Sequence, residues 1–154
     1  EKYVVEVSRQ GFVWRQEYLR GEPTTPVEKI RETDKTGTKT TFWPDPEIFT
    51  ETTHIDRDVI ANRLREMAFL NKGLKIRYID AATKEEHDFH FEGGIGSYVE
   101  FLNKNKTVLF EQPIYIDKAV DNMQVEIAMQ YTDAYNESVL SFANNIIHTV
   151  VVLT

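Results

Sequence analysis

Two threonines in the first third of the chain have the spacing of ligand-binding hydroxyl groups. Thr38 and Thr40 alternate along a predicted strand with Phe42 on the same face, because successive side chains of a strand point to opposite faces. A hydroxyl group on a buried face needs a hydrogen-bond partner. That partner is either a backbone group, the commoner case, or a ligand bound beneath the sheet, and the spacing does not decide between them.

The histidines and acidic residues are poorly placed to hold a metal ion. His87 and His90 are three residues apart, which in a strand puts their side chains on opposite faces. We expect both to be solvated. An acidic run lacks the spacing and the central glycine of a calcium-binding loop, and we expect it on a solvated loop and a helix start, where negative charge is favourable. This run consists of Asp45, Glu47, Glu51, Asp56 and Asp58. The sequence therefore predicts no metal site.

Composition excludes further classes of chemistry. The chain has no cysteine, so disulfides, thiolate nucleophiles and thiolate zinc sites are absent. The glycine-rich segment 93–96 has neither the lysine of a P-loop nor the spacing of a dinucleotide-binding turn, so we interpret it as a turn or a domain hinge. The formal charge of −7 disfavours unaided binding to nucleic acid or to anionic lipid.

Length and hydropathy set the class of protein. The 154 residues are 41% apolar, which is enough for one or two small cores. No apolar run approaches the roughly 18 residues of a membrane span. The start of the chain has no signal-peptide pattern and resembles the interior of a longer sequence. We therefore expect a cytoplasmic protein without membrane contact.

Periodicity predicts an α+β chain. Apolar residues that recur at three and four positions predict a helix from an N-cap at Asp56 to a C-cap at 71–73. A shorter helix is expected at 98–102. Alternating residues predict strands at 5–8, 12–19, 38–43, 74–78, 88–91, 113–116, 125–131 and 139–142. The segment 21–26 is not expected to continue either strand of the first hairpin, and the segment 33–37 is rich in turn residues.

Seven segments of the sequence resemble the N-terminal ATPase region of DNA gyrase B subunits. The matching subunit of topoisomerase IV is the nearest relative of that family. The resemblance extends over residues 9–145, nearly without interruption. The matching segments are residues 35–38, 42–49, 63–73, 91–95, 98–104, 125–131 and 141–146. Matches of this length are highly specific.

The resemblance implies a fold and two binding residues. Residues 1–92 would be the C-terminal portion of a GHKL-type ATP-binding α/β sandwich, and residues 93–154 the start of a transducer domain with the ribosomal-protein-S5-like fold. Thr38 matches the threonine that contacts adenine through an ordered water and also contacts aminocoumarin inhibitors. Arg9 matches an arginine at the pocket rim that contacts those inhibitors. ATP and magnesium are the cofactors of the family.

The family's catalytic groups have no counterpart in this sequence. No Glu is followed four residues later by Asn, and neither the Asp-x-Gly-x-Gly that reads adenine nor the glycine-rich lid occurs. The lysine that reaches the terminal phosphate in the family lies in a later loop. Without a general base, a metal ligand and phosphate-binding amides, phosphoryl transfer loses its main sources of acceleration. We therefore predict no catalytic residue, no metal ligand and no ATP hydrolysis by the chain alone.

Two functions of different classes remain open, and a third is weak. The leading interpretation is a piece of the ATPase region of a gyrase B subunit, whose parent introduces negative supercoils together with the gyrase A subunit and DNA. The alternative is a truncated non-catalytic paralogue that acts as an interaction module on full-length gyrase B or topoisomerase IV. It is motivated by the apolar tail 150–153, which could add an edge strand to another chain. The third interpretation, an unrelated α+β binding domain, would require the sequence matches to be a coincidence.

Self-association of the chain is expected, because a sandwich without its first helices exposes the apolar face of its sheet.

Overall fold

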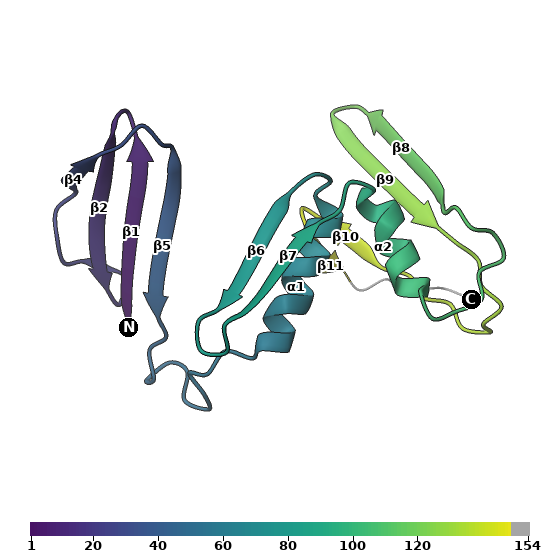
Figure 1. Cartoon of the computed structure of the whole chain (residues 1–154), viewed down its shortest axis with the longest axis horizontal. Coiled ribbons are helices and arrows are strands. Elements are labelled where there is room, and N and C mark those ends of the chain that lie inside the picture. Colours follow the sequence, from purple (N-terminus) through teal and green to yellow (C-terminus); the bar gives the residue numbers. More distant parts are fainter. Residues whose placement is uncertain (149–154) are drawn as a thin grey trace. The chain divides into compact units, whose positions relative to one another are not determined.

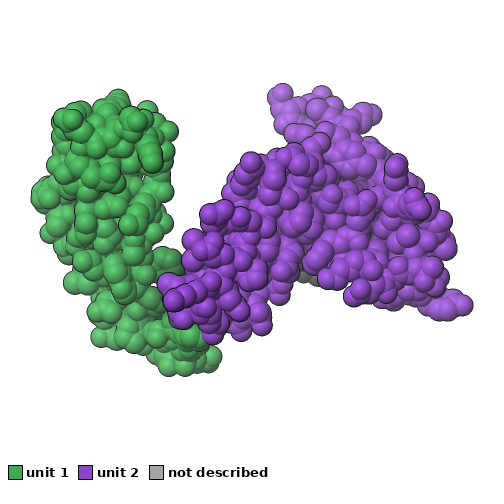
Figure 2. Space-filling view, in the orientation of Figure 1, with its two compact units in different colours: residues 1–55 green, residues 56–154 purple. Residues whose placement is uncertain are grey.

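The computed structural model describes residues 1–148 of the chain, which form two compact units. Unit 1 is residues 1–55 and unit 2 begins at Asp56 (Figure 2). The predicted α+β class is confirmed, since strands dominate and both described helices lie in unit 2. The predicted boundary between residues 92 and 93 lies inside unit 2, where helices on either side of it are packed together. As a boundary between evolutionary domains it stays a prediction.

Unit 1 is a single antiparallel sheet. β1 lies between β2 and β5, and β2 pairs with two short strands on its other edge (Figure 1). The strands are β1 Lys2–Arg9, β2 Phe12–Leu19, β3 Glu22–Pro23, β4 Glu28–Glu32 and β5 Gly37–Trp43. β1 and β2 are joined by Gln10 and Gly11, both with positive φ (55° and 82°), as a type I′ turn requires. The first hairpin and the third strand are thus confirmed, whereas β3 and β4 were not predicted.

The two faces of this sheet differ in composition and burial. One face carries Val4 and Val13, both buried, beneath long charged side chains. Glu17 on this face forms ion pairs with Lys2 (2.9 Å) and Arg15 (2.5 Å), and these contacts lower the pKa of the Glu17 carboxyl group. Long charged side chains of this kind cover apolar surface with their methylene groups while the charges stay at the surface. The opposite face is mostly apolar and hydroxylated.

Unit 2 begins with the predicted helix. α1 spans Arg57–Leu70, and the carboxylate of Asp56 accepts a hydrogen bond from the Val59 amide at 3.1 Å. The helix ends at Asn71, whose amide donates to the Met67 carbonyl, and Gly73 follows with a φ of 78°. Both predicted caps are therefore confirmed. The second hairpin follows as β6 Lys75–Asp80 and β7 Glu85–His90.

The rest of unit 2 is a second helix and two hairpins. α2 begins four residues earlier than predicted, inside the glycine-rich segment, since Gly94 adopts a φ of 57° and opens the helix. The elements are α2 Gly94–Asn103, β8 Ile114–Val120, β9 Met123–Met129, β10 Ser141–Ala143 and β11 Ile146–His148. β11 was not predicted. The tail 150–153, on which the interaction-module interpretation depends, lies outside the described residues.

The core of unit 2 is centred on Phe69. This side chain is 2% exposed, and its ring stacks on Phe91 with centroids 3.5 Å apart. Tyr98 and Phe101 of α2 complete the cluster, at 5.0 and 5.4 Å from Phe69. Burial raises the pKa of the Tyr98 hydroxyl, and the negative charge of Glu66 raises it further. The aromatic cluster thus joins α1 to α2.

Candidate functional site

The two predicted binding residues lie on the same face of unit 1 and at the same end of its sheet. The register pairs Thr38 with Val7, and Arg9 is two residues further along β1. Such diagonal neighbours in antiparallel strands are typically about 7–8 Å apart. Both side chains are exposed. The fold therefore brings together two residues that are 29 positions apart in the sequence.

The face around Thr38 is built from apolar side chains and hydroxyl groups. Val5 is paired with Thr40, just as Val7 is paired with Thr38. The expectation that this face is buried was wrong for the described residues, because Thr38 and Thr40 are both exposed and Phe42 is 62% exposed. Within residues 1–148 neither hydroxyl has a hydrogen bond to a protein group, so both are available to a ligand or to water.

A lysine at the edge of this face was missed by sequence reasoning. Phe12 is the cross-strand partner of Arg9, and the ammonium group of Lys29 lies 3.0 Å from the centre of the Phe12 ring. Trp14, the cross-strand partner of Lys29, packs edge-on against Phe12 with centroids 6.4 Å apart. Lys29 belongs to β4, which has no alternating pattern, so no local signal places it here. Arg9 and Lys29 give this end of the face two positive charges.

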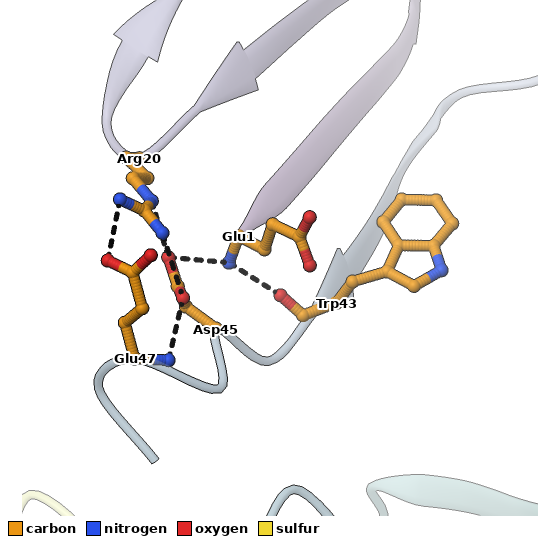
Figure 3. A network of polar contacts seen from close by, with 5 residues as sticks. All are labelled: Glu1, Arg20, Trp43, Asp45 and Glu47. Carbon is orange, nitrogen blue, oxygen red and sulfur yellow. Dashed lines mark hydrogen bonds and ion pairs between the residues drawn. The ribbon is translucent and has the colours of Figure 1, made fainter. Parts of the chain in front are cut away.

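A network of polar contacts closes the opposite end of the sheet (Figure 3). Asp45 is only 2% exposed; it accepts a hydrogen bond from the Glu47 amide at 3.0 Å and an ion pair from Nε of Arg20 at 2.7 Å. The Glu47 amide first, and then Arg20, lower the pKa of the Asp45 carboxyl group. Arg20 also pairs with the Glu47 carboxylate at 2.9 Å, and both contacts raise its pKa. The network ties the turn after β2 to the chain after β5.

The prediction that Asp45 lies on a solvated loop was therefore wrong. Its burial depends on Arg20, which is 25 residues away and could not be identified as a partner from spacing. The rest of the acidic run is as expected: Glu47 and Glu51 are exposed, Asp56 caps α1, and Asp58 lies in its first turn.

The histidines lie on opposite faces of β7, as predicted. His87 stacks between Tyr78 and Phe89, with centroids 6.1 Å from each. His90 pairs through Nε2 with the Glu92 carboxylate at 2.7 Å. In the part of the chain that the structure describes, no group of three histidines or acidic residues could hold a metal ion, and no helix is long and apolar enough to cross a membrane.

Comparison with known proteins gives this arrangement a family. The family model described as DNA gyrase B matches residues 94–150. The DNA gyrase B subunit of Clostridium acetobutylicum is 52% identical over 147 residues, which are 95% of this chain and 23% of the relative. A gyrase B subunit of Streptococcus pyogenes is 54% identical over 94% of this chain and 22% of its own length. The chain belongs to the DNA gyrase B family. It spans less than a quarter of the length of these curated relatives.

Solved gyrase B structures have the same fold. The 43K ATPase domain of Thermus thermophilus gyrase B in complex with an aminocoumarin aligns with a TM-score of 0.87 and 38% identity, over 96% of this chain and 40% of that chain. The B-subunit of the DNA gyrase from Myxococcus xanthus aligns with a TM-score of 0.86 and 26% identity, over 95% of this chain and 43% of that chain. The described residues therefore have the α+β fold of a part of the gyrase B ATPase domain.

Proposed function

We propose that this chain forms one wall of the nucleotide pocket of a gyrase B ATPase region and the first part of its transducer. The observation that carries the proposal is the exposed face on which Thr38 and Arg9 meet, in a fold that matches an ATPase domain solved with an aminocoumarin. The parent protein would be a cytoplasmic ATP-dependent type II topoisomerase that introduces negative supercoils together with the gyrase A subunit.

The residues of this face suit one end of a nucleotide. Val5 and Val7 offer a flat apolar surface for a planar base, and the Thr38 hydroxyl can both donate and accept a hydrogen bond at its edge. Arg9 and Lys29 supply positive charge at the rim. Such a site needs apolar lining with a few placed polar groups, and this face provides both.

Magnesium does not fit the described residues. Magnesium requires carboxylate or other oxygen ligands, and within residues 1–148 no suitable cluster exists. Because the chain lacks a metal ligand and a catalytic general base, we propose that it binds the adenine of ATP weakly and does not hydrolyse ATP. The remaining pocket groups would belong to segments outside the 154 residues.

The test is a nuclear magnetic resonance titration of the purified chain with an aminocoumarin and, separately, with a non-hydrolysable ATP analogue and magnesium. We expect shift changes limited to the Thr38 face of β1, β2 and β5, with weak affinity. Thr38→Ala should reduce the aminocoumarin response. Thr41→Ala is the matched control, because Thr41 lies on the opposite face of the same strand.

Two results would count against the proposal. The Thr38 face would not be the binding surface if the shift changes mapped to unit 2. The same conclusion would follow if Thr41→Ala reduced the shift changes as much as Thr38→Ala does. Magnesium-dependent release of phosphate by the purified chain would contradict the proposal that the chain does not hydrolyse ATP.

A second candidate function is an interaction module for full-length gyrase B or topoisomerase IV. One face of the β8–β9 hairpin favours it, since this face is almost entirely apolar and its apolar residues are exposed. These residues are Ile114, Ile116, Val120, Met123, Val125, Ile127 and Met129. Exposed apolar patches mark interaction surfaces. Sedimentation should then show self-association or co-migration with either full-length protein, and a strictly monomeric chain that binds neither of them would exclude this function.

A further inference from the structure

Hydrogen bonds join α1 to a hairpin that follows it by more than 70 residues. Nη2 of Arg63 donates to the backbone carbonyl of Asn145 at 2.6 Å. The side-chain amide of Asn145 donates to Oδ1 of Asn71 at 3.2 Å. The Asn71 amide group in turn donates to the Met67 carbonyl in the last turn of the helix, at 2.7 Å. The β10–β11 turn is therefore held against the second half of α1, beside which Figure 1 draws it.

The turn itself is preformed for these contacts. Asn144 and Asn145 have φ values of 49° and 65°, so they form a two-residue type I′ turn between Ala143 and Ile146. Asparagine tolerates this left-handed region better than most residues. Asn144 makes no side-chain hydrogen bond to another residue among 1–148, which leaves Asn145 as the member of the pair that contacts α1.

The helix side of the contact is also held in place. Glu66 lies one turn beyond Arg63 and forms an ion pair with its Nη1, so one nitrogen of the guanidinium is fixed while the other binds Asn145. A planar guanidinium that is held at one nitrogen loses less entropy when the next hydrogen bond forms. Arg63, Asn71 and Asn145 are all partly buried, which shields the three hydrogen bonds from water.

Aromatic contacts run alongside these hydrogen bonds. Phe142 of β10 lies 6.5 Å from Tyr98 of α2, and Tyr98 lies 5.0 Å from Phe69 of α1. The hairpin, α2 and α1 thus share one continuous set of contacts. This set includes residues from both sides of the glycine-rich segment 93–96.

We propose that Arg63, Asn71 and Asn145 form a latch that couples the β10–β11 hairpin to α1, so that the hairpin moves with the helix. The latch rests on contacts within residues 56–148. Its role as a link between the nucleotide-binding region and the transducer rests on the proposed function. The aromatic contacts of Phe142 reach α1 only through Tyr98 of α2, whereas the hydrogen bonds of Asn145 join the turn to Arg63 and Asn71 directly.

The test is amide hydrogen exchange of the complete 154-residue chain with Asn145→Gly and, as the matched control, Asn144→Gly. Glycine suits the left-handed conformation at both positions, so the turn is preserved and only a side chain is removed. Loss of one partly buried neutral hydrogen bond should speed exchange of the β10 and β11 amides by roughly fivefold in Asn145→Gly. Asn144→Gly should change the exchange by less than about twofold, because no side-chain bond is lost. The amides of β8 and β9, which form a separate two-stranded sheet, should not change.

A second variant tests the coupling to α1. In an Asn71→Ala background, Asn145→Gly should have no further effect on the hairpin amides, because the partner of the Asn145 side chain is already gone. Equal effects of Asn144→Gly and Asn145→Gly, or a full Asn145→Gly effect in Asn71→Ala, would overturn the latch. Neither result depends on nucleotide binding, so failure of the latch and failure of the proposed nucleotide site are distinguishable.

Discussion

Replacing Phe69 by leucine should destabilise unit 2 and leave unit 1 unchanged. Phe69 is 2% exposed and has three aromatic neighbours with centroids at 3.5, 5.0 and 5.4 Å. A swap between large apolar residues usually costs less than about 1.5 kcal/mol. Each lost aromatic contact adds about 0.5–1.5 kcal/mol. Leucine recovers part of this by packing, so we expect a loss of about 2 kcal/mol in the free energy of unfolding of unit 2.

The chain provides a separate probe for each unit. Both tryptophans, Trp14 and Trp43, belong to unit 1, so their fluorescence reports that unit. Both described helices belong to unit 2, so the helical signal of far-UV circular dichroism reports unit 2. With a urea slope of about 1 kcal/mol/M, a loss of about 2 kcal/mol lowers the midpoint of the helical transition by about 2 M. The fluorescence transition should not move.

Phe42→Leu is the matched control. Phe42 is 62% exposed on the sheet of unit 1, and exposed substitutions usually change stability by less than about 0.5 kcal/mol. If Phe69→Leu shifts the helical transition no more than Phe42→Leu shifts the fluorescence transition, the aromatic cluster does not stabilise unit 2. The reasoning from burial and ring contacts would then be refuted.

Two further predictions concern carboxylates. Asp56→Ala should lower the stability of the helical transition by about 1 kcal/mol, because the Val59 amide loses its cap, whereas Asp56→Asn should retain most of it. Asp45 has a lowered pKa in the folded chain, so its ionised form stabilises unit 1 above the unfolded pKa of about 3.9, and this stability is lost as the pH falls through the folded value. Urea unfolding followed by tryptophan fluorescence, repeated at decreasing pH, should show this loss, and Asp45→Asn should remove it.

Local patterns predicted the elements that have local causes. α1 was predicted from its three- and four-residue apolar repeat and from Asp56, and the structure places a cap bond at that residue. The first hairpin was predicted from alternation on both sides of a turn that contains Gly11. In each case, the residues that determine the element lie within it or next to it. Such information is present in a single sequence.

The elements that were missed have non-local causes. β4 has an exposed, mostly charged sequence without alternation, and it becomes a strand because the edge of β2 is available to pair with it. Asp45 is buried because Arg20, 25 residues earlier, reaches it from the turn after β2. Alternation predicted that Thr38 shares a face with Thr40. That Arg9 lies beside Thr38 depends on the register of β1 with β5, which spacing alone does not determine.

The sheet of unit 1 shows why its function is proposed on one face and not on the other. The charged face neutralises itself, since Glu6 and Glu17 are both paired with Arg15, and Val4 is buried beneath it. The opposite face has the composition of an interior, with valines, aromatic rings and threonine hydroxyls, yet Phe42 is 62% exposed there. An apolar surface with unpaired hydroxyl groups becomes more stable when another component covers it and supplies hydrogen bonds to the hydroxyl groups. Of the two faces of this sheet, the face that contains Thr38 is therefore the one that a bound component would stabilise more.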